Sequence, residues 1–235
     1  MADFGRAKRE LYRNKVPFSR SDYPALPWKC DNAIMINVYF EIQKERHLDH
    51  LLSEYSRTSP AYCRLSIFEV KESPVGSFRD ACIGLGCRLG ILPAVVVAAS
   101  ITDNAKVLAA GIAERGFPNT LGKIELEIDK THANATISDD QGQLLEVGLP
   151  SLQTMEPGRL AFDHADGIIT REDGGLDLVA TPAEMTIQQA ALCKNARIEY
   201  PADRDGIWQI LNCRHIVSGQ LVSGVRTFSA GQKPQ

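Results

Sequence analysis

Residues 123 to 129 read Lys123-Ile124-Glu125-Leu126-Glu127-Ile128-Asp129 and give the clearest signal of local structure in the chain. Apolar and charged residues alternate strictly, which is the period of a β-strand with one buried face. We expect the isoleucines and the leucine to face the core and the charged residues to face solvent. A half-exposed strand is typical of an antiparallel sheet, because parallel strands are usually covered on both faces.

The rest of the chain predicts more strands. The long apolar region 81–101 contains Arg88, Pro93 and three glycines, which favours two buried strands over a membrane-spanning helix. Other segments rich in Ile, Val and Leu and bounded by turn residues predict strands at 34–40, 64–70, 143–147 and 212–221.

Helices are fewer. Leucines at helical spacing predict a helix over 41–55, and Thr181 and Pro182 predict the start of a second helix that ends near Leu192. The expected fold is therefore a β-rich α+β class with peripheral helices. No repeat divides the chain, so we expect a single domain over 1–235, with 1–25 as an N-terminal arm.

The composition restricts the functional classes. A net charge of -3 without a basic half argues against nucleic-acid binding. Six cysteines without a C-x-x-C motif or a signal sequence favour reduced thiols and a cytoplasmic location. His47-Leu48-Asp49-His50 has the spacing of a helical ligand pair, but it falls on the charged face of the predicted helix. We interpret it as solvated surface and expect no metal site.

Five local patterns resemble, in order, those of the acetoacetate decarboxylase family. The most specific is the Gly-Phe-Pro block, which is similar to the family's Gly-Phe/Tyr-Pro-Lys-Lys-Leu segment. The patterns are Leu26-Pro27-Trp28-Lys29 with Asp31-Asn32, Ile67-Phe68-Glu69-Val70, Gly76-Ser77-Phe78-Arg79-Asp80, Ala110-Gly111 with Gly116-Phe117-Pro118-Asn119-Thr120-Leu121-Gly122-Lys123-Ile124, and Arg214-His215-Ile216.

The resemblance implies an acetoacetate decarboxylase-like antiparallel β-barrel or cone, and a homo-oligomer. It also implies that key residues differ. Asn119 and Thr120 stand at the positions of the family's Schiff-base lysine pair, and Ala33 stands at the position of its substrate arginine. Of the family's acidic pair, Glu69 is retained and the second carboxylate is shortened to Asp80. Because neither a carboxamide nor a hydroxyl forms an imine, the decarboxylation mechanism is not expected at these positions.

The expected catalytic residues are Asp80 and Glu69 for proton transfer, with Asn119 and Thr120 as donors to a developing enolate. Each also has a structural interpretation. Glu69 fits an ion pair with Arg79 or Arg214, Asp80 fits a turn, and Asn119 and Thr120 fit turn residues. The residues expected to bind substrate are Arg79, Phe117, Ala33 and Arg214.

We expect Lys123 to be a surface lysine and not a replacement for the missing amine. Strand alternation sends Arg214 and His215 to opposite faces, so only one of them can face the interior. The pocket is expected to be apolar, and a free carboxylate substrate is disfavoured unless Arg79, Arg88 or Arg115 points inward.

The leading hypothesis is a lyase or an isomerase/cyclase that performs acid–base enol chemistry on a carbonyl-containing, polyketide-like intermediate. Such chemistry includes hydration, dehydration, isomerisation and cyclisation. We expect no cofactor, and the small-molecule carbonyl substrate as a partner, without nucleic acid or membrane. Two alternatives stay open. One is a β-keto acid decarboxylase that uses a different lysine, and the other is a non-catalytic small-molecule binding protein.

Overall fold

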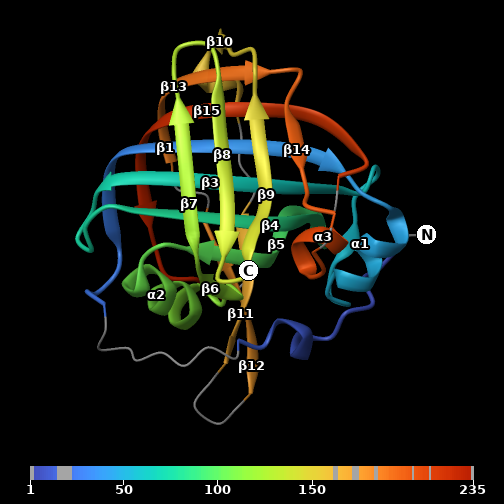
Figure 1. The fold of residues 1–235 in the computed structure, drawn as a ribbon. Coiled ribbons are helices and arrows are strands. Elements are labelled where there is room, and N and C mark those ends of the chain that lie inside the picture. Colours follow the sequence, from blue (N-terminus) through green and yellow to red (C-terminus); the bar gives the residue numbers. More distant parts are fainter. Residues whose placement is uncertain are drawn as a thin grey trace.

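The computed structural model describes residues 3–14, 23–160, 164–170, 175–182, 185–202, 204–211 and 213–233. Most strands belong to one large, mainly antiparallel sheet (Figure 1). Its strands, in the order in which they pair, are β10 (Gln153–Met155), β13 (Met185–Cys193), β15 (His215–Phe228), β1 (Trp28–Glu41), β3 (Tyr62–Glu72), β4 (Phe78–Leu89), β5 (Leu92–Thr102), β11 (His164–Thr170) and β12 (Leu176–Thr181). Two short strands lie off this path: β2 (Ser56–Arg57) pairs with β4, and β6 (Asn119–Leu121) pairs with β5.

A second sheet of four antiparallel strands crosses in front of the large sheet in Figure 1. Its order is β14 (Arg197–Glu199), β9 (Gly142–Leu149), β8 (Ala133–Asp139) and β7 (Lys123–Ile128). The helices lie at the periphery: α1 (Lys44–His50), α2 (Ala105–Arg115), α3 (Ile207–Ile210) and the 3₁₀ turns η1 (Arg9–Tyr12) and η3 (Pro157–Arg159). The β-rich class with peripheral helices is confirmed, whereas the described pairings leave both sheets open and do not close a barrel.

The main core lies between the two sheets. Ile36, Ile67 and Ile83 of the large sheet join one buried cluster with Ile137 and Val147 of the small sheet. We call this side of the large sheet the near face. Because side chains alternate along a strand, the residues between these core positions point to the opposite side, which we call the far face.

The strand predictions are largely confirmed. The 123–129 pattern forms β7, with Ile124 buried and Lys123, Glu125 and Glu127 exposed. The apolar region 81–101 lies within the β4–β5 hairpin, which turns at Gly90 with a φ of 62°. Among the described residues, no helix is long and apolar enough to span a membrane.

One helix prediction is wrong and the other is confirmed only in part, both because of contacts with distant segments. The segment predicted as a helix from Thr181 to Leu192 contains β13, which pairs antiparallel with β15. The helix predicted over 41–55 covers only 44–50, because backbone amides of the N-terminal segment donate to carbonyl oxygens at and beyond its C-terminal end. The amides of Arg6 and Ala7 donate to the oxygens of Leu48 and Leu51 at 2.8 and 2.9 Å.

The interpretation of His47 as solvated surface is wrong. Its side chain is buried, and Nε2 lies 3.0 Å from the Gly86 carbonyl oxygen, to which it donates. Burial lowers the pKa of His47 from 6.5 to about 4. The described residues contain no group of three or more His, Cys, Asp and Glu side chains that could hold a metal ion.

Candidate functional site

A continuous row of six polar side chains crosses the far face of the large sheet. The residues occupy directly paired positions on six neighbouring strands, so their side chains point the same way. We call this set the polar row. It consists of Gln220 on β15, Asn37 on β1, Ser66 on β3, Cys82 on β4, Ser100 on β5 and Asn119 on β6.

Four of the six residues of the polar row are buried, Cys82 and Gln220 are half-buried, and three polar atoms of the row lack a hydrogen-bond partner among the described residues. Asn37, Ser66, Ser100 and Asn119 are each at most 5% exposed. The Ser66 hydroxyl donates to Asn37 Oδ1 at 2.6 Å. Asn37 Nδ2, Asn119 Oδ1 and Gln220 Oε1 are buried atoms without a hydrogen-bond partner in the described part of the chain. Buried polar atoms normally have a partner, so three such atoms on one face indicate a place for a ligand or ordered water.

A buried ion pair lies in the adjacent row. Asp80 pairs across the sheet with Phe68, and its two carboxylate oxygens accept bonds from Arg226 Nη1 and Nη2 at 2.8 and 3.2 Å. The side chains are 16% and 7% exposed. Burial opposes the charge of Arg226, but the adjoining Asp80 carboxylate outweighs it, so the pKa of Arg226 is raised. A bidentate pair fixes both groups in one orientation.

Two guanidinium groups alternate with aromatic rings beside this pair. The Cζ atom of Arg226 lies 3.6 Å from the ring centre of Phe68 and 5.5 Å from that of Phe228. Arg115 Cζ lies 4.3 Å from the ring centre of Phe228 and 4.4 Å from that of Phe117. Cation–π contacts at these distances hold both cations in a largely apolar setting.

The Gly-Phe-Pro-Asn segment places Asn119 in the row. Helix α2 begins at the Asn104 cap, whose side chain accepts from two backbone amides, and it ends at Gly116, where φ is 64°. A Cβ at Gly116 would lie 2.4 Å from the Ile168 carbonyl carbon, so both the turn and this close approach require glycine. β6 then pairs parallel with β5, which sets Asn119 opposite Ser100.

Cys82 lies between Ser66 and Ser100 in the polar row, two residues from Asp80 on β4. Burial raises its pKa, while Arg64, Arg115 and Arg226 lower it and Asp80 raises it further. Arg64 lies two residues from Ser66 on β3 and Asp80 lies two residues from Cys82 on β4, so both side chains point to the far face. The site therefore combines one carboxylate, three arginines, a thiol and several amides and hydroxyls in a buried setting.

The structure brings three of the predicted site residues to this cluster: Asp80, Asn119 and Phe117. Ala33 also lies on the far face, two residues before Met35 on β1. Its side chain is buried in an apolar cluster with Trp28 and not among the polar groups.

The other four predicted site residues lie elsewhere. Glu69 and Arg79 point to the near face and bond to each other at 2.7 Å, and Arg79 also donates to the Ile124 carbonyl. Thr120 is exposed, and its hydroxyl donates to the Ser100 carbonyl at 3.3 Å. Arg214 is exposed beside Glu41, at the opposite end of β1 from Ala33.

Sequence reasoning missed Arg226, Asn37 and Gln220. A signal for Arg226 exists, because a charged residue stands in phase with Val222 and Phe228 in an alternating strand. No local signal distinguishes Asn37 from an outward-facing residue, because its burial depends on what covers the far face.

All lysines that the structure describes are exposed, from Lys8 to Lys233; Lys15 lies outside the described residues. Lys123 bonds to Glu125 at 2.6 Å, as expected for a surface lysine. No lysine of the described ranges therefore belongs to the buried cluster.

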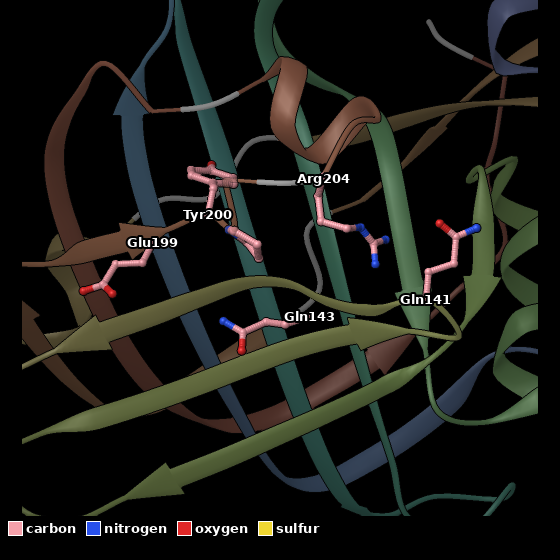
Figure 2. A pocket seen from close by; sticks show the side chains of 6 residues that line it. Gln141, Gln143, Glu199, Tyr200 and Arg204 are labelled. Carbon is pink, nitrogen blue, oxygen red and sulfur yellow. The ribbon is translucent and has the colours of Figure 1, made fainter.

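Two hollows on the small sheet lie apart from this cluster. Figure 2 shows the first, of about 470 Å³, which is lined by Gln141, Gln143, Glu199, Tyr200, Pro201 and Arg204. Arg204 Nη2 bonds to Asp139 at 2.7 Å, so its charge is balanced locally. The second, of about 460 Å³, is lined by Arg79 together with Glu125, Leu126, Glu127, Asn134, Ala135, Thr136 and Glu146.

Comparisons with known proteins give one clear result, which is the fold. No family model matches the chain, and no curated protein matches its sequence. A structure described as "Structural Studies of Acetoacetate Decarboxylase" superposes with a TM-score of 0.81 at 14% identity, covering 93% of this chain and 94% of that one. Acetoacetate decarboxylase from Legionella pneumophila subsp. pneumophila str. Philadelphia 1 gives 0.80 at 15% identity, with 97% and 94% covered.

A third neighbour is the enduracididine biosynthesis enzyme MppR complexed with pyruvate. It superposes with a TM-score of 0.73 at 14% identity, covering 89% of this chain and 90% of that one. At such identities the likeness concerns the fold alone. The chain has an acetoacetate decarboxylase-like fold.

Proposed function

We propose that this chain is an enzyme that performs acid–base enol chemistry on a small carbonyl compound at the far-face cluster. The reaction class is a lyase or an isomerase/cyclase, and no imine forms. The observation that carries the proposal is the buried polar row, whose unsatisfied Asn119 amide lies on the same face as the Asp80–Arg226 pair. Buried polar atoms next to a fixed ion pair are typical of a site that binds a polar reactant.

The lysine distribution supports chemistry without an imine. An imine needs a primary amine next to the carbonyl, and the described lysines are all exposed. The resemblance to acetoacetate decarboxylase sequences assigns the lysine positions to Asn119 and Thr120. Charge on an enolate would then be met by hydrogen-bond donors and cations.

Asp80 is the proposed proton-transfer group. Its carboxylate holds Arg226 and retains further lone pairs, and its 16% exposure leaves a route to a reactant. A positioned carboxyl contributes roughly 10²–10⁴-fold to such a step. Asn119 is the proposed partner of the enol oxygen, either as acceptor from the hydroxyl or, with its amide turned over, as donor to the oxyanion.

The substrate is proposed to carry an anionic or strongly polar carbonyl group. The sequence disfavoured a carboxylate unless an arginine such as Arg115 pointed inward, and Arg115 is 7% exposed on the far face next to Phe228. The fold neighbour MppR was solved with pyruvate, a 2-oxo acid. Simple 2-oxo acids and 1,3-dicarbonyl compounds are therefore the first candidates.

The test is a mass-spectrometric screen of 2-oxo acids, 1,3-dicarbonyl compounds and enones with matched variants. Asp80→Asn and Asn119→Ala should lower any conversion by roughly 10²-fold or more, whereas Glu69→Gln and Thr120→Ala should retain it. Borohydride treatment with each active compound should leave the protein mass unchanged. A borohydride-dependent adduct of ligand mass contradicts this mechanism and favours a β-keto acid decarboxylase with another lysine.

A non-catalytic binding protein makes a different prediction in the same screen. It would retain a co-purified small molecule unchanged, and Asp80→Asn would not alter any associated activity. Binding without conversion of any compound by the wild type would favour this second function.

The assembly and location are also proposals. We propose that the single-domain chain forms a homo-oligomer, as the resemblance to acetoacetate decarboxylases implies. We also propose a reducing compartment, since the six cysteines are free. Light scattering of the purified chain tests the assembly, and a monomer at cellular concentrations contradicts it.

A further inference from the structure

The far face holds a second recognition element next to the proposed reaction centre, formed by Asn37 and Gln220. These residues lie directly opposite each other on β1 and β15. Side chains at such positions start about 5 Å apart. Asn37 Nδ2 is a buried donor and Gln220 Oε1 is a buried acceptor, and both lack a partner among the described residues. They do not bond to each other, so one free donor and one free acceptor stand side by side.

The orientation of the Asn37 amide is fixed by its neighbour. The Ser66 hydroxyl donates to Asn37 Oδ1 at 2.6 Å, which identifies Oδ1 as the acceptor end and leaves Nδ2 as the free end. Asn37 is fully buried, so the free NH₂ group cannot reach bulk water. An unsatisfied buried donor costs roughly 1–3 kcal/mol, which a complementary ligand group would recover.

We infer that Asn37 and Gln220 bind a neutral carboxamide group of the substrate, distal to its reacting carbonyl. A carboxamide offers an oxygen to Asn37 Nδ2 and an NH to Gln220 Oε1 at once. A carboxylate would set negative charge against Gln220 Oε1, and an ammonium group has no acceptor for Asn37. Of these three polar groups, the carboxamide alone satisfies both atoms.

The sheet sets the length of the substrate. Asn37 on β1 and Asp80 on β4 are separated by two strand spacings, about 10 Å, and by two residues along the strand, about 7 Å, which together amount to about 12 Å. This inference depends on the proposed function in placing the reacting carbonyl next to Asp80. The substrate class is thus a chain with an enolisable carbonyl at one end and a carboxamide about 12 Å away.

Binding of stable probes tests the inference without requiring turnover. The probes are 1,3-diketones of increasing chain length that end in a primary carboxamide, each compared with the same chain ending in isopropyl, which has a similar shape. The wild type should bind the carboxamide of matching length about 100-fold more tightly, because two hydrogen bonds form and two buried atoms gain partners. Calorimetry or ligand-observed NMR measures both affinities.

Variants assign this preference to the pair. Gln220→Met, at a half-buried position, should reduce the preference to about 10-fold, and Asn37→Leu/Gln220→Met should remove it. Ser66→Ala keeps both amides but releases the orientation of Asn37, so it should also weaken the preference. Gln189→Met, at an exposed glutamine on β13, is the matched control and should leave the preference intact. If the double variant Asn37→Leu/Gln220→Met does not fold, Gln220→Met and Ser66→Ala decide.

Failure of this inference differs from failure of the proposed function. Equal affinities for both probes in the wild type, or no binding of either, overturn the inference, as does a preference that survives Gln220→Met and Ser66→Ala. A carboxamide preference without turnover of any compound supports the inference and contradicts the proposed function.

Discussion

Two arginine–carboxylate pairs occupy opposite faces of strand β4 and differ in every respect that concerns function. Arg79 and Asp80 are neighbours in the sequence, so their side chains point to opposite faces. Arg79 bonds to Glu69 on the near face, where its side chain is 36% exposed. Asp80 bonds to Arg226 on the far face, where the arginine is 7% exposed and packs against Phe68.

The surroundings of the two pairs explain their different roles. The near-face pair links the two sheets, because Arg79 also donates to the Ile124 carbonyl of β7. The far-face pair lies next to buried polar atoms that have no partner in the described structure. An identical type of ion pair is therefore structural on one face and part of the proposed site on the other.

The largest expected difference between the faces is in activity. Asp80→Asn should lower kcat/KM by roughly 10²–10⁴-fold on any compound the screen identifies, because it removes the proposed proton-transfer group. Glu69→Gln, the matched change on the near face, should alter kcat/KM less than threefold. Steady-state kinetics on folded samples measures both. A larger loss in Glu69→Gln than in Asp80→Asn would reverse the assignment.

The same comparison applies to stability. Arg226→Met should lower the free energy of unfolding by about 3 kcal/mol, because it leaves Asp80 without its partner in a mostly buried position. Arg79→Met should lower it by about 1 kcal/mol or less, because its pair is more exposed. Urea denaturation measures both changes. In the double variant Asp80→Asn/Arg226→Met much of the loss should be recovered, and an unrecovered loss argues against the ion pair as its cause.

A further comparison concerns neighbours on β6. Asn119→Ala should lower kcat by roughly 10²-fold, the typical effect of removing one group that contacts a developing oxyanion. Thr120→Ala changes an exposed side chain and should have little effect. Equal losses of kcat in the two variants would contradict a catalytic role for Asn119 and would indicate that β6 has only a structural role.

The last comparison concerns His47, a buried polar group that lies outside the site. Because the pKa of His47 is lowered from 6.5 to about 4 by burial, the unfolded chain binds its proton more readily than the folded protein. This contribution to stability is full above pH ~6.5, falls as the pH drops toward ~4, and amounts to about 3 kcal/mol. His47→Leu should flatten the pH dependence of unfolding in this range, whereas His215→Leu, at an exposed position, should not. Unchanged curvature in His47→Leu would contradict the burial argument.

Local patterns predict most strands but not the site as a whole. The alternation in 123–129 and the Gly-Pro breaks in 81–101 report burial directly, so β7 and the β4–β5 hairpin follow from the sequence. The helix predicted up to Leu192 is instead β13, because pairing with β15 outweighs local propensity.

The site depends on register between distant strands. Asp80, Asn119 and Phe117 carry a sequence pattern and could be proposed. Arg226 lies 146 residues from Asp80 and could not be assigned to it without the structure. The same holds for Asn37 and Gln220, which meet only through the β1–β15 pairing.

The most direct test of the far-face mechanism is hydrogen–deuterium exchange at the carbon next to a ketone. Pyruvate and a stable 1,3-diketone are incubated with the protein in D₂O and followed by proton NMR. We predict that the wild type and Glu69→Gln accelerate deuterium incorporation at this carbon and that Asp80→Asn does not. Treating the protein with the compound and borohydride, and removing both before the assay, should leave the rate unchanged. Exchange that persists in Asp80→Asn, or that borohydride abolishes, would contradict enol chemistry without an imine at Asp80.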